Sequence, residues 1–416
     1  MKNNKSNKTL RFAKYLIGLA IICTLVLGMI SANAANEITM LYDDYMDITT
    51  KQVEIIDAGT PTSFQVGYGV AANTPDTAVV TKRDGYLVAT GIGTAKVKID
   101  GVEQTITVKP APISVLLLAG QSNMRGSEGS KEQSIVCPTG RVYSTYGVPE
   151  SMTVANASNY AASALTGDKC TINVNGGTSH LIENPIYSLV AKGAGKVGAD
   201  SGIAYEWTLQ TNEKVWIINA AHGGSQIESW NLEDTTSSYG DNYTEAKNLF
   251  DACMSTLQKE IAAGHFTFSH MGYLWCQGET SVNANKDAAY YIEQFTKMHN
   301  LFTSTMKYDL DSDPSTPDST FEFAGNIQVR KGGESSGTYR QGTYPESYVA
   351  AGKNIAHYES FYDLRMSGPR VAQFWMANSP DFPYFWNVCT VQEEWVIIPD
   401  GTSGVEEYFK AHYPNG

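Results

Sequence analysis

The chain has 416 residues, 42% of them hydrophobic, which is enough for two globular domains with sizeable cores. The first 34 residues carry five basic residues and no acidic one, so removing them lowers the formal net charge from −13 to −18. A chain this acidic is not expected to bind nucleic acid or an anionic membrane surface, and it suits a neutral partner.

The first 34 residues are typical of a secretory signal peptide. A basic start precedes a nearly uninterrupted apolar run at 15–30, and Ala32-Asn33-Ala34 fits the small-x-small cleavage pattern. We therefore predict cleavage after Ala34 and a mature protein that is secreted or on the bacterial cell surface, without a membrane span. The alternative is an uncleaved membrane anchor, for which the apolar run is short.

Five cysteines remain after this cleavage: Cys137, Cys170, Cys253, Cys276 and Cys389. An odd number excludes a fully paired disulfide framework, and the spacings match no zinc site. Cys137 and Cys170 could pair across one loop region, or both could be buried thiols.

Residues 36–109 predict a small β-sandwich. Six short β-prone runs occur there, and Asp84-Gly85 and Asp100-Gly101 are tight-turn signals between such runs. The stretch DTAVVTKRDGYLVATGIGTAKVKI at 76–99 resembles the second half of a bacterial Ig-like domain of group 2. Pro110-Ala-Pro112 is interpreted as a short stiff linker.

From residue 113 to the end, apolar runs alternate with helical patterns. Five strands are predicted, at 113–119, 215–221, 270–275, 321–328 and 385–392, with long helices at 243–263 and 286–306. Continuous apolar strands between helices indicate a five-stranded parallel sheet covered on both faces. In such sheets the ligand site lies beyond the carboxyl ends of the strands.

Three predicted strands end in residues suited to acyl transfer. The first is followed by Gly120-Gln121-Ser122-Asn123-Met124, the second by His222-Gly223-Gly224-Ser225-Gln226 and the third by Cys276-Gln277-Gly278-Glu279. Ser122 would be the nucleophile, while its own N–H, the N–H of Gly223 or Gly224 and the Gln277 amide would stabilise the oxyanion. Taken singly, Ser122 could be a helix N-cap, the glycines a turn and Gln277 a loop hydrogen-bonder. Position 124 is Met, so the Gly-x-Ser-x-Gly elbow of α/β-hydrolases is absent.

The motifs GQSNM, HGGSQIESW and LWCQGET resemble the leading blocks of the SGNH hydrolases, and most closely the sialate O-acetylesterase-type branch that includes carbohydrate esterase family six. Gly368-Pro-Arg370-Val-Ala-Gln373 is similar to the Arg-x-x-Gln helix of that branch. The resemblance covers residues 113 to about 392. It implies a three-layer α/β/α sandwich and removal of acetyl groups from sugars without a metal. It places Ser122, Gly223 and Gln277 in the catalytic machinery, and we assign Gln121, Asn123, Gly224 and Glu279 to substrate binding.

The histidine that the family uses as base, in an Asp-x-x-His block, has no counterpart in this sequence. His412 with Asp400 could form an irregular dyad, or the sequence could stop before its catalytic histidine, which is the interpretation we favour. A third option is an inactive pseudoenzyme. His222 could line the pocket, while His265, His270 and His299 are interpreted as structural.

The sequence predicts neither a cofactor nor a metal. Residues 309–313 begin like a calcium loop, but Pro314 and Thr320 stand where Gly and Glu are required. We expect a secreted serine esterase acting on acetylated carbohydrate. The alternative is a carbohydrate-binding or adhesion protein that keeps the esterase fold.

Overall fold

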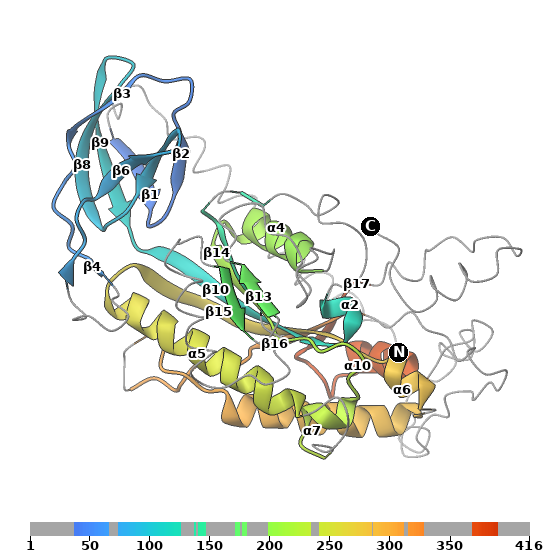
Figure 1. Cartoon of the computed structure of the whole chain (residues 1–416). Helices are drawn as coiled ribbons and strands as arrows, with labels where there is room; N and C mark the ends of the chain where they lie inside the picture. The colour runs from blue at the N-terminus through green and yellow to red at the C-terminus, as the bar shows by residue number, and fades with distance from the viewer. Residues whose placement is uncertain are drawn as a thin grey trace, which may run out of the picture.

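The computed structural model describes residues 37–65, 74–125, 137–138, 140–146, 171–174, 177–180, 199–233, 241–284, 286–311, 315–327 and 368–389. The predicted signal peptide, Cys170, Asp400 and His412 lie outside them. Within the described residues, no helix has the length and apolar character needed to span a bilayer. Figure 1 shows a β-domain at one end of the molecule and a larger α/β-domain that begins where the β-domain ends.

The N-terminal domain is a β-sandwich. One sheet has the strand order β1-β9-β8-β3, a second has the order β2-β7-β6, and β4 pairs with β5. In β8, Ala95, Val97 and Ile99 face the core while their neighbours are exposed, which is the alternation of a half-buried strand. The strands are β1 Glu37–Leu41, β2 Tyr45–Asp47, β3 Val53–Asp57, β4 Phe64–Gln65, β5 Thr74–Pro75, β6 Val80–Arg83, β7 Tyr86–Ala89, β8 Gly93–Ile99 and β9 Val102–Lys109.

Both predicted tight turns of this domain are confirmed. Asp84-Gly85 joins β6 to β7, and Asp100-Gly101 joins β8 to β9. All four residues have positive φ angles, between 50° and 86°. Two successive residues with positive φ match the right-handed twist of the flanking strands.

The second domain contains a parallel sheet in the order β11-β14-β10-β15-β16-β17. The predicted parallel α/β class is confirmed, and all five predicted strands are present. Their bounds are β10 Ala111–Gly120, β14 Lys214–Asn219, β15 Phe266–Cys276, β16 Phe323–Ile327 and β17 Phe385–Cys389. A separate hairpin is formed by β12 Thr171–Val174 and β13 Gly177–His180.

The predicted count of five strands was wrong, because a sixth strand, β11 Val142–Tyr146, pairs with β14 at the edge of the sheet. Its sequence, VYSTY, carries Ser144 and Thr145 between aromatic residues and lacks the continuous apolar run of the inner strands. Both polar residues are nevertheless buried, and the Thr145 hydroxyl accepts a hydrogen bond from the indole of Trp216 at 3.0 Å.

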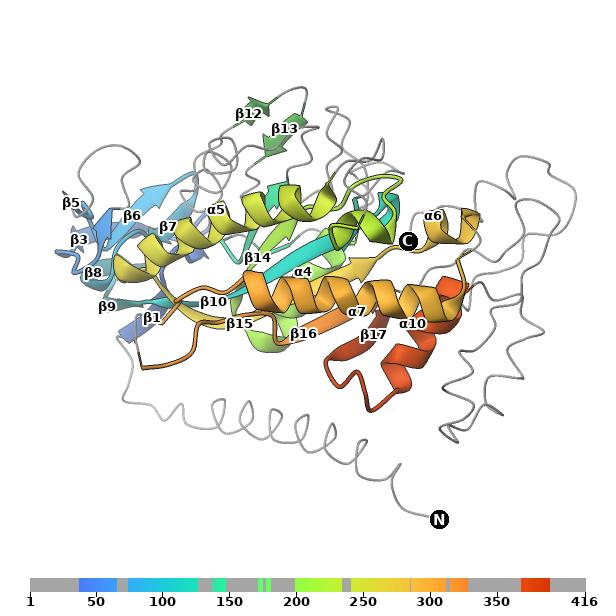
Figure 2. The same cartoon turned by 90° about the horizontal axis from the view of Figure 1, so that it is seen from below.

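Helices cover both faces of this sheet, as Figures 1 and 2 show. Alternate residues of β10 contribute to two hydrophobic clusters, one shared with α5, α7 and α10 and one shared with α4. The helices are α2 Ser122–Arg125, α4 Asp200–Thr211, α5 Asn242–Ala262, α6 Glu279–Asn283, α7 Ala288–Thr305 and α10 Gly368–Asn378, with a 3-10 turn, η2, at Ile227–Trp230. The predicted helices at 243–263 and 286–306 correspond to α5 and α7.

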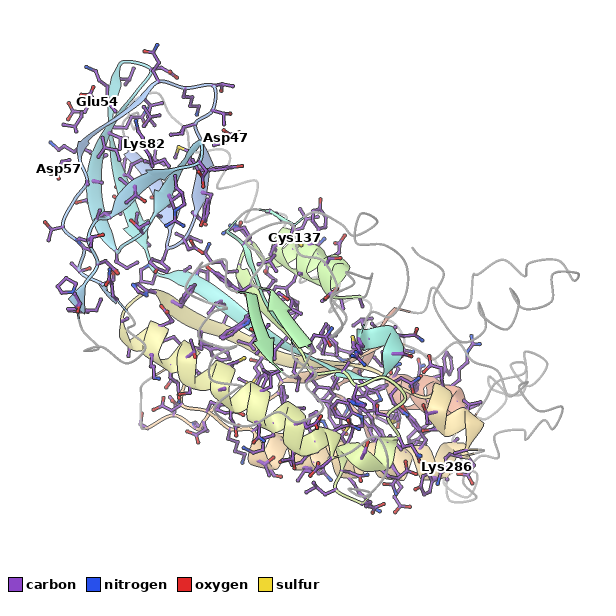
Figure 3. The ribbon with its side chains drawn as sticks, viewed as in Figure 1. Asp47, Glu54, Asp57, Lys82, Cys137 and Lys286 are labelled. Atoms are coloured by element: carbon purple, nitrogen blue, oxygen red, sulfur yellow. The ribbon has the colours of Figure 1, made fainter. Side chains whose placement is uncertain are left out.

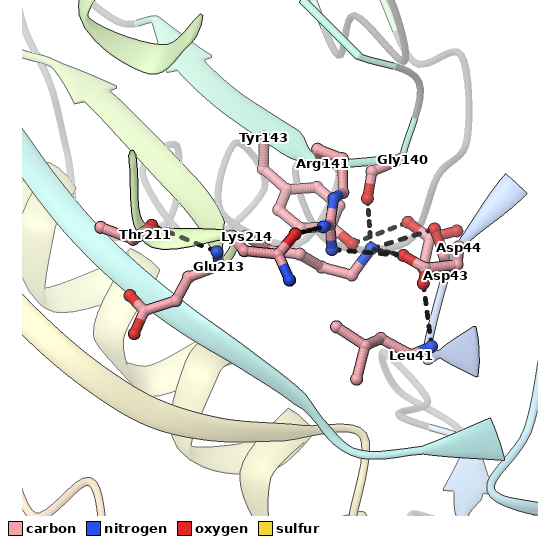
Figure 4. Close-up of polar contacts among 10 residues, drawn as sticks. Leu41, Asp43, Asp44, Gly140, Arg141, Tyr143, Thr211, Glu213 and Lys214 are labelled. Atoms are coloured by element: carbon pink, nitrogen blue, oxygen red, sulfur yellow. Dashed lines mark hydrogen bonds and ion pairs between the residues drawn. The ribbon is translucent and has the colours of Figure 1, made fainter. Parts of the chain in front are cut away.

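The two domains meet at the amino ends of the parallel strands. Lys214, the first residue of β14, is fully buried and donates to Asp44 Oδ1 and to the Asp43 carbonyl, both at 3.1 Å (Figure 4). Tyr143 donates to the Asp43 carboxylate at 2.7 Å. The predicted linker does not separate the domains, because Ala111 and Pro112 already pair with β15 as the first residues of β10.

Candidate active site

The three predicted site segments follow three adjacent strands. β10 lies between β14 and β15 and is parallel to both, so the carboxyl ends of these strands meet at one edge. Ser122 is the first residue of α2 and half-buried. Gly223 follows β14, and Gln277 follows β15. The topology therefore brings together the serine, glycine and glutamine that the sequence singled out.

Gly120 allows the end of β10 to approach β15. Its φ is 128°, and a Cβ at this position would lie 2.1 Å from the carbonyl oxygen of Cys276. The backbone of β10 therefore turns into α2 in a conformation that favours glycine. Ser122 follows two residues later, at the edge of the sheet.

Hydrogen bonds connect the three strand ends directly. The backbone N–H of Gln121 donates to the Cys276 carbonyl at 2.8 Å, and the N–H of His222 donates to the Gly120 carbonyl at 2.9 Å. The Ser225 hydroxyl also donates to the Gly120 carbonyl, at 3.1 Å. These bonds fix the segment before Ser122 to both neighbouring segments.

The glycine pair adopts a turn between β14 and η2. Gly224 has a φ of 77°, and its carbonyl accepts a hydrogen bond from the Thr280 hydroxyl at 3.2 Å. At Gly223, a Cβ would lie 3.4 Å from the guanidinium of Arg125, so the Arg125 side chain passes beside this glycine. Gly223 therefore faces α2, the helix that begins with Ser122.

The Gln277 side chain is fully buried among these segments. Its amide nitrogen donates to the Ser225 carbonyl at 3.2 Å and to the Ser281 hydroxyl at 3.1 Å. It therefore connects the turn after β14 with α6. To donate to an oxyanion as predicted, the Gln277 amide must give up its hydrogen bond to either the Ser225 carbonyl or the Ser281 hydroxyl.

The residues assigned to substrate binding lie below the surface of the same edge. Gln121, Asn123 and Glu279 are all buried. The Gln121 side-chain oxygen accepts from the backbone N–H groups of Gly278 and Thr280, both at 3.3 Å, and Asn123 donates to the Glu279 carboxylate. In this structure these three side chains join the turn after β10 to the turn after β15.

Among the histidines, His222 stands nearest in the chain to the site, half-buried beside the glycine pair. The structural interpretation of His265, His270 and His299 agrees with their partners. His265 lies between Glu260 and Asp76, His270 contacts Glu322, and His299 contacts the Tyr273 hydroxyl. Burial lowers the pKa of His299 to about 4, so this imidazole is neutral at physiological pH. Asp400 and His412 lie outside the described residues.

Several residues that shape the site carry weak sequence signals. Ser225 contacts both Gly120 and, through its carbonyl, Gln277, and Trp230 donates to its hydroxyl at 3.1 Å. Ser281 follows Gln277 by four residues and accepts from its amide. In the sequence, a serine beside a glycine pair indicates only a turn. The role of Ser225 in joining Gly120 to Gln277 becomes visible once the three segments are packed together.

A polar cluster lies at the same end of the molecule as α6 and the start of α7, where Figure 3 labels Lys286. Glu228 of η2 is buried, accepts from the Tyr290 hydroxyl, and pairs with Lys286 at 3.1 Å. The Lys286 ammonium also lies 4.2 Å from the centroid of the Tyr290 ring. Within the described residues, no group of three or more His, Cys, Asp or Glu side chains could hold a metal ion.

Comparison with known proteins finds one family model that matches the segment containing these residues. Residues 112–313 match the family model described as "Carbohydrate esterase, sialic acid-specific acetylesterase". No curated protein matches the chain.

Two solved structures are similar. One is a carbohydrate acetylesterase from Xanthomonas citri, with 18% identity over 70% of this chain and 57% of that chain and a TM-score of 0.29. The other is a protein from Arabidopsis thaliana, with 13% identity over 53% of this chain and 75% of that chain and a TM-score of 0.31. The match thus spans less than two thirds of the length of the first. The family match is specific to the segment that carries Ser122, Gly223 and Gln277, so residues 112–313 form a carbohydrate esterase domain of the sialic acid-specific acetylesterase family.

Proposed function

We propose that the chain is a secreted serine esterase that removes O-acetyl groups from carbohydrate. The observation that carries this proposal is the placement of Ser122 at the end of the central strand, hydrogen-bonded through its neighbours to the turns that carry Gly223 and Gln277. A hydroxyl nucleophile between segments that present N–H donors is what acyl transfer requires.

In the proposed reaction, Ser122 Oγ attacks the acetyl carbonyl and its proton passes to a base. The oxyanion is stabilised by the N–H groups of Ser122 and Gly223, with Gln277 as the predicted third donor. The tetrahedral intermediate collapses, and the protonated base returns its proton to the departing sugar hydroxyl. Water then attacks the acetyl-enzyme, which releases acetate and restores Ser122.

We propose a histidine as the base, and the candidates in this sequence are His222 and His412, the latter with Asp400 as its proposed partner. The rival proposal is a protein that binds acetylated carbohydrate without hydrolysing it. The absence of an Asp-x-x-His block favours that rival.

The test is acetate release by the purified chain from p-nitrophenyl acetate, O-acetylated sialic acid and acetylated xylan, beside Ser122→Ala. We expect Ser122→Ala to abolish turnover. His412→Ala and His222→Ala then identify the base.

Loss of a single oxyanion donor should lower kcat by roughly a hundred- to a thousand-fold. Gln277→Ala is therefore compared with Ser281→Ala, which removes only one acceptor of the Gln277 amide. Binding of the acetylated glycan without acetate release would support the binding protein instead.

A further inference from the structure

A buried hydrogen-bond network surrounds the backbone carbonyl of Gln277. The carbonyl oxygen of Gln277 accepts from the Tyr291 hydroxyl and from the Gln373 side-chain amide, both at 2.7 Å. The same Gln373 amide contacts the Tyr291 hydroxyl at 3.1 Å, and the Trp275 indole donates to that hydroxyl at 3.0 Å. All four residues are fully buried, and they come from β15, the residue that follows it, α7 and α10.

The hydrogen-bonding capacity of the Tyr291 hydroxyl is fully used. It donates to the Gln277 carbonyl and accepts from the Trp275 indole and the Gln373 amide, whose nitrogen is also within hydrogen-bond distance of the Gln277 carbonyl. Burial raises the pKa of Tyr291 well above its ordinary value, so the hydroxyl stays protonated and continues to donate. A buried network whose members are satisfied in this way rigidifies the groups that it joins.

The group that this network holds is the peptide between Gln277 and Gly278. Its carbonyl accepts hydrogen bonds from Tyr291 and Gln373. Its N–H, which is that of Gly278, donates to the side chain of Gln121 at 3.3 Å. Gln121 immediately precedes Ser122. Gly278 has a φ of 155°, which residues with a side chain rarely adopt, so this turn requires glycine at position 278.

We propose that Gln373, acting with Tyr291, is a positioning residue of the esterase site. Its amide acts through the Gln277 carbonyl and the Tyr291 hydroxyl. It fixes the plane of the Gln277–Gly278 peptide and, through that peptide, both the Gln277 side chain and the Gln121 contact beside Ser122. The inference rests on the proposed function for its catalytic consequence, but the orientation of the peptide can be tested independently of activity.

The test uses Gln373→Met, which keeps the length of the side chain and removes its hydrogen bonds, and Tyr291→Phe. The matched control is Gln294→Met, because Gln294 is also a buried glutamine and its amide contacts Asn231 instead of Gln277. We expect amide hydrogen exchange in peptides spanning 276–284 to become roughly ten-fold faster in Gln373→Met and Tyr291→Phe, and to stay at the wild-type rate in Gln294→Met.

The kinetic expectation is a fall in kcat on p-nitrophenyl acetate of roughly ten- to a hundred-fold in Gln373→Met, with KM within about two-fold of wild type, because misplaced groups slow the chemical step more than binding. The double variant Tyr291→Phe/Gln373→Met should lose little more than either single variant, since both act through one carbonyl.

Wild-type exchange at 276–284 in Gln373→Met would overturn the proposal, and so would a kcat loss no larger than that of Gln294→Met. A wild-type chain without esterase activity, combined with faster exchange in Gln373→Met, would refute the proposed function while supporting the positioning of the turn.

Discussion

Gly120 is the residue at which the strand carrying the nucleophile comes closest to its neighbour. A methyl group there would face two costs, the positive φ of 128° and an overlap with the Cys276 carbonyl at 2.1 Å. A positive φ costs a residue with a side chain about 1–2 kcal/mol, and overpacking adds about 1–3 kcal/mol. We predict that Gly120→Ala lowers the free energy of unfolding by the sum of both and displaces Ser122.

The control is Gly264→Ala, because Gly264 has a φ of 88° and no atom lies within 4 Å of the position of its Cβ. It should lose only the smaller, conformational cost and keep its esterase activity. Chemical denaturation of both variants measures the difference. Equal losses of stability would show that β15 can move away from Gly120.

At this scale the sequence identifies residues better than it identifies their partners. The common location of Ser122, Gly223 and Gln277 could be predicted because each follows an apolar run whose end lies at the same sheet edge, while their catalytic roles stay a prediction. The contacts of Gln121 with Gly278 and of Gln373 with Gln277 join segments 157 and 96 residues apart, and no local pattern encodes such pairs.

Helix α7 contributes residues to the candidate site, so the stability of its first turn should affect the site. Asp287 precedes this helix, and its carboxylate accepts from the Tyr290 N–H at 2.8 Å. Asp241 caps α5 in the same way, through Thr244 at 2.9 Å. Replacing such a cap with alanine typically costs about 1 kcal/mol, because backbone donors of the first turn lose their acceptor.

We predict that Asp287→Ala and Asp241→Ala destabilise the protein similarly, but that only Asp287→Ala lowers kcat. The first turn of α7 carries Tyr290 and Tyr291, which contact Glu228 and the Gln277 carbonyl. Thermal unfolding and acetyl ester hydrolysis of the two variants make the comparison. An equal decrease in kcat in both variants would mean that activity follows the overall stability of the protein and does not depend specifically on the first turn of α7.

The same scale shows where sequence patterns fail for whole elements. The inner strands and long helices could be predicted because continuous apolar runs and helical periodicity mark them. β11 could not, since its buried Ser144 and Thr145 interrupt the apolar signal and its burial comes from the segments around it. Pro110-Ala-Pro112 suggested a linker, but the pairing of Ala111 and Pro112 with β15 extends the central strand to the β-sandwich.

In the whole molecule, the β-sandwich and the site occupy opposite ends of the sheet (Figure 1). The sandwich contacts the first residues of β10 and β14, and Ser122 follows the last residue of β10, so about 30 Å separates them at roughly 3.3 Å per residue. The interface combines apolar packing of Leu41 and Tyr42 against the core of the α/β-domain with polar contacts around the buried Lys214. Lys214 has its countercharge in Asp44, whose carboxylate also lies 3.6 Å from Arg141. Removing one partner of a buried ion pair is strongly destabilising, so the two domains are expected to depend on each other for stability.

His265 makes this interface sensitive to pH. Its ring is buried between Glu260 and Asp76, at 2.5 and 2.9 Å, and stacks on Tyr42 of the sandwich with the ring centroids 4.0 Å apart. Burial alone lowers the pKa of this imidazole, but the hydrogen bonds and charges of Asp76 and Glu260 outweigh it and raise the pKa to about 9. Since the folded value exceeds the ordinary 6.5, the contribution of His265 is fully present below pH 6.5 and is lost as the pH rises through 9.

Neighbouring groups titrate as well. Burial raises the pKa values of Glu260 and Tyr42 and lowers that of Lys214, so the pH profile of the wild type alone does not isolate His265. We therefore predict a difference. Between pH 6 and 10 the wild type should lose about 3 kcal/mol more unfolding free energy than His265→Gln, whose amide keeps hydrogen bonds but no titrating charge. Urea denaturation of both proteins across this range measures it. Parallel pH profiles would mean that His265 is not charged in the folded protein.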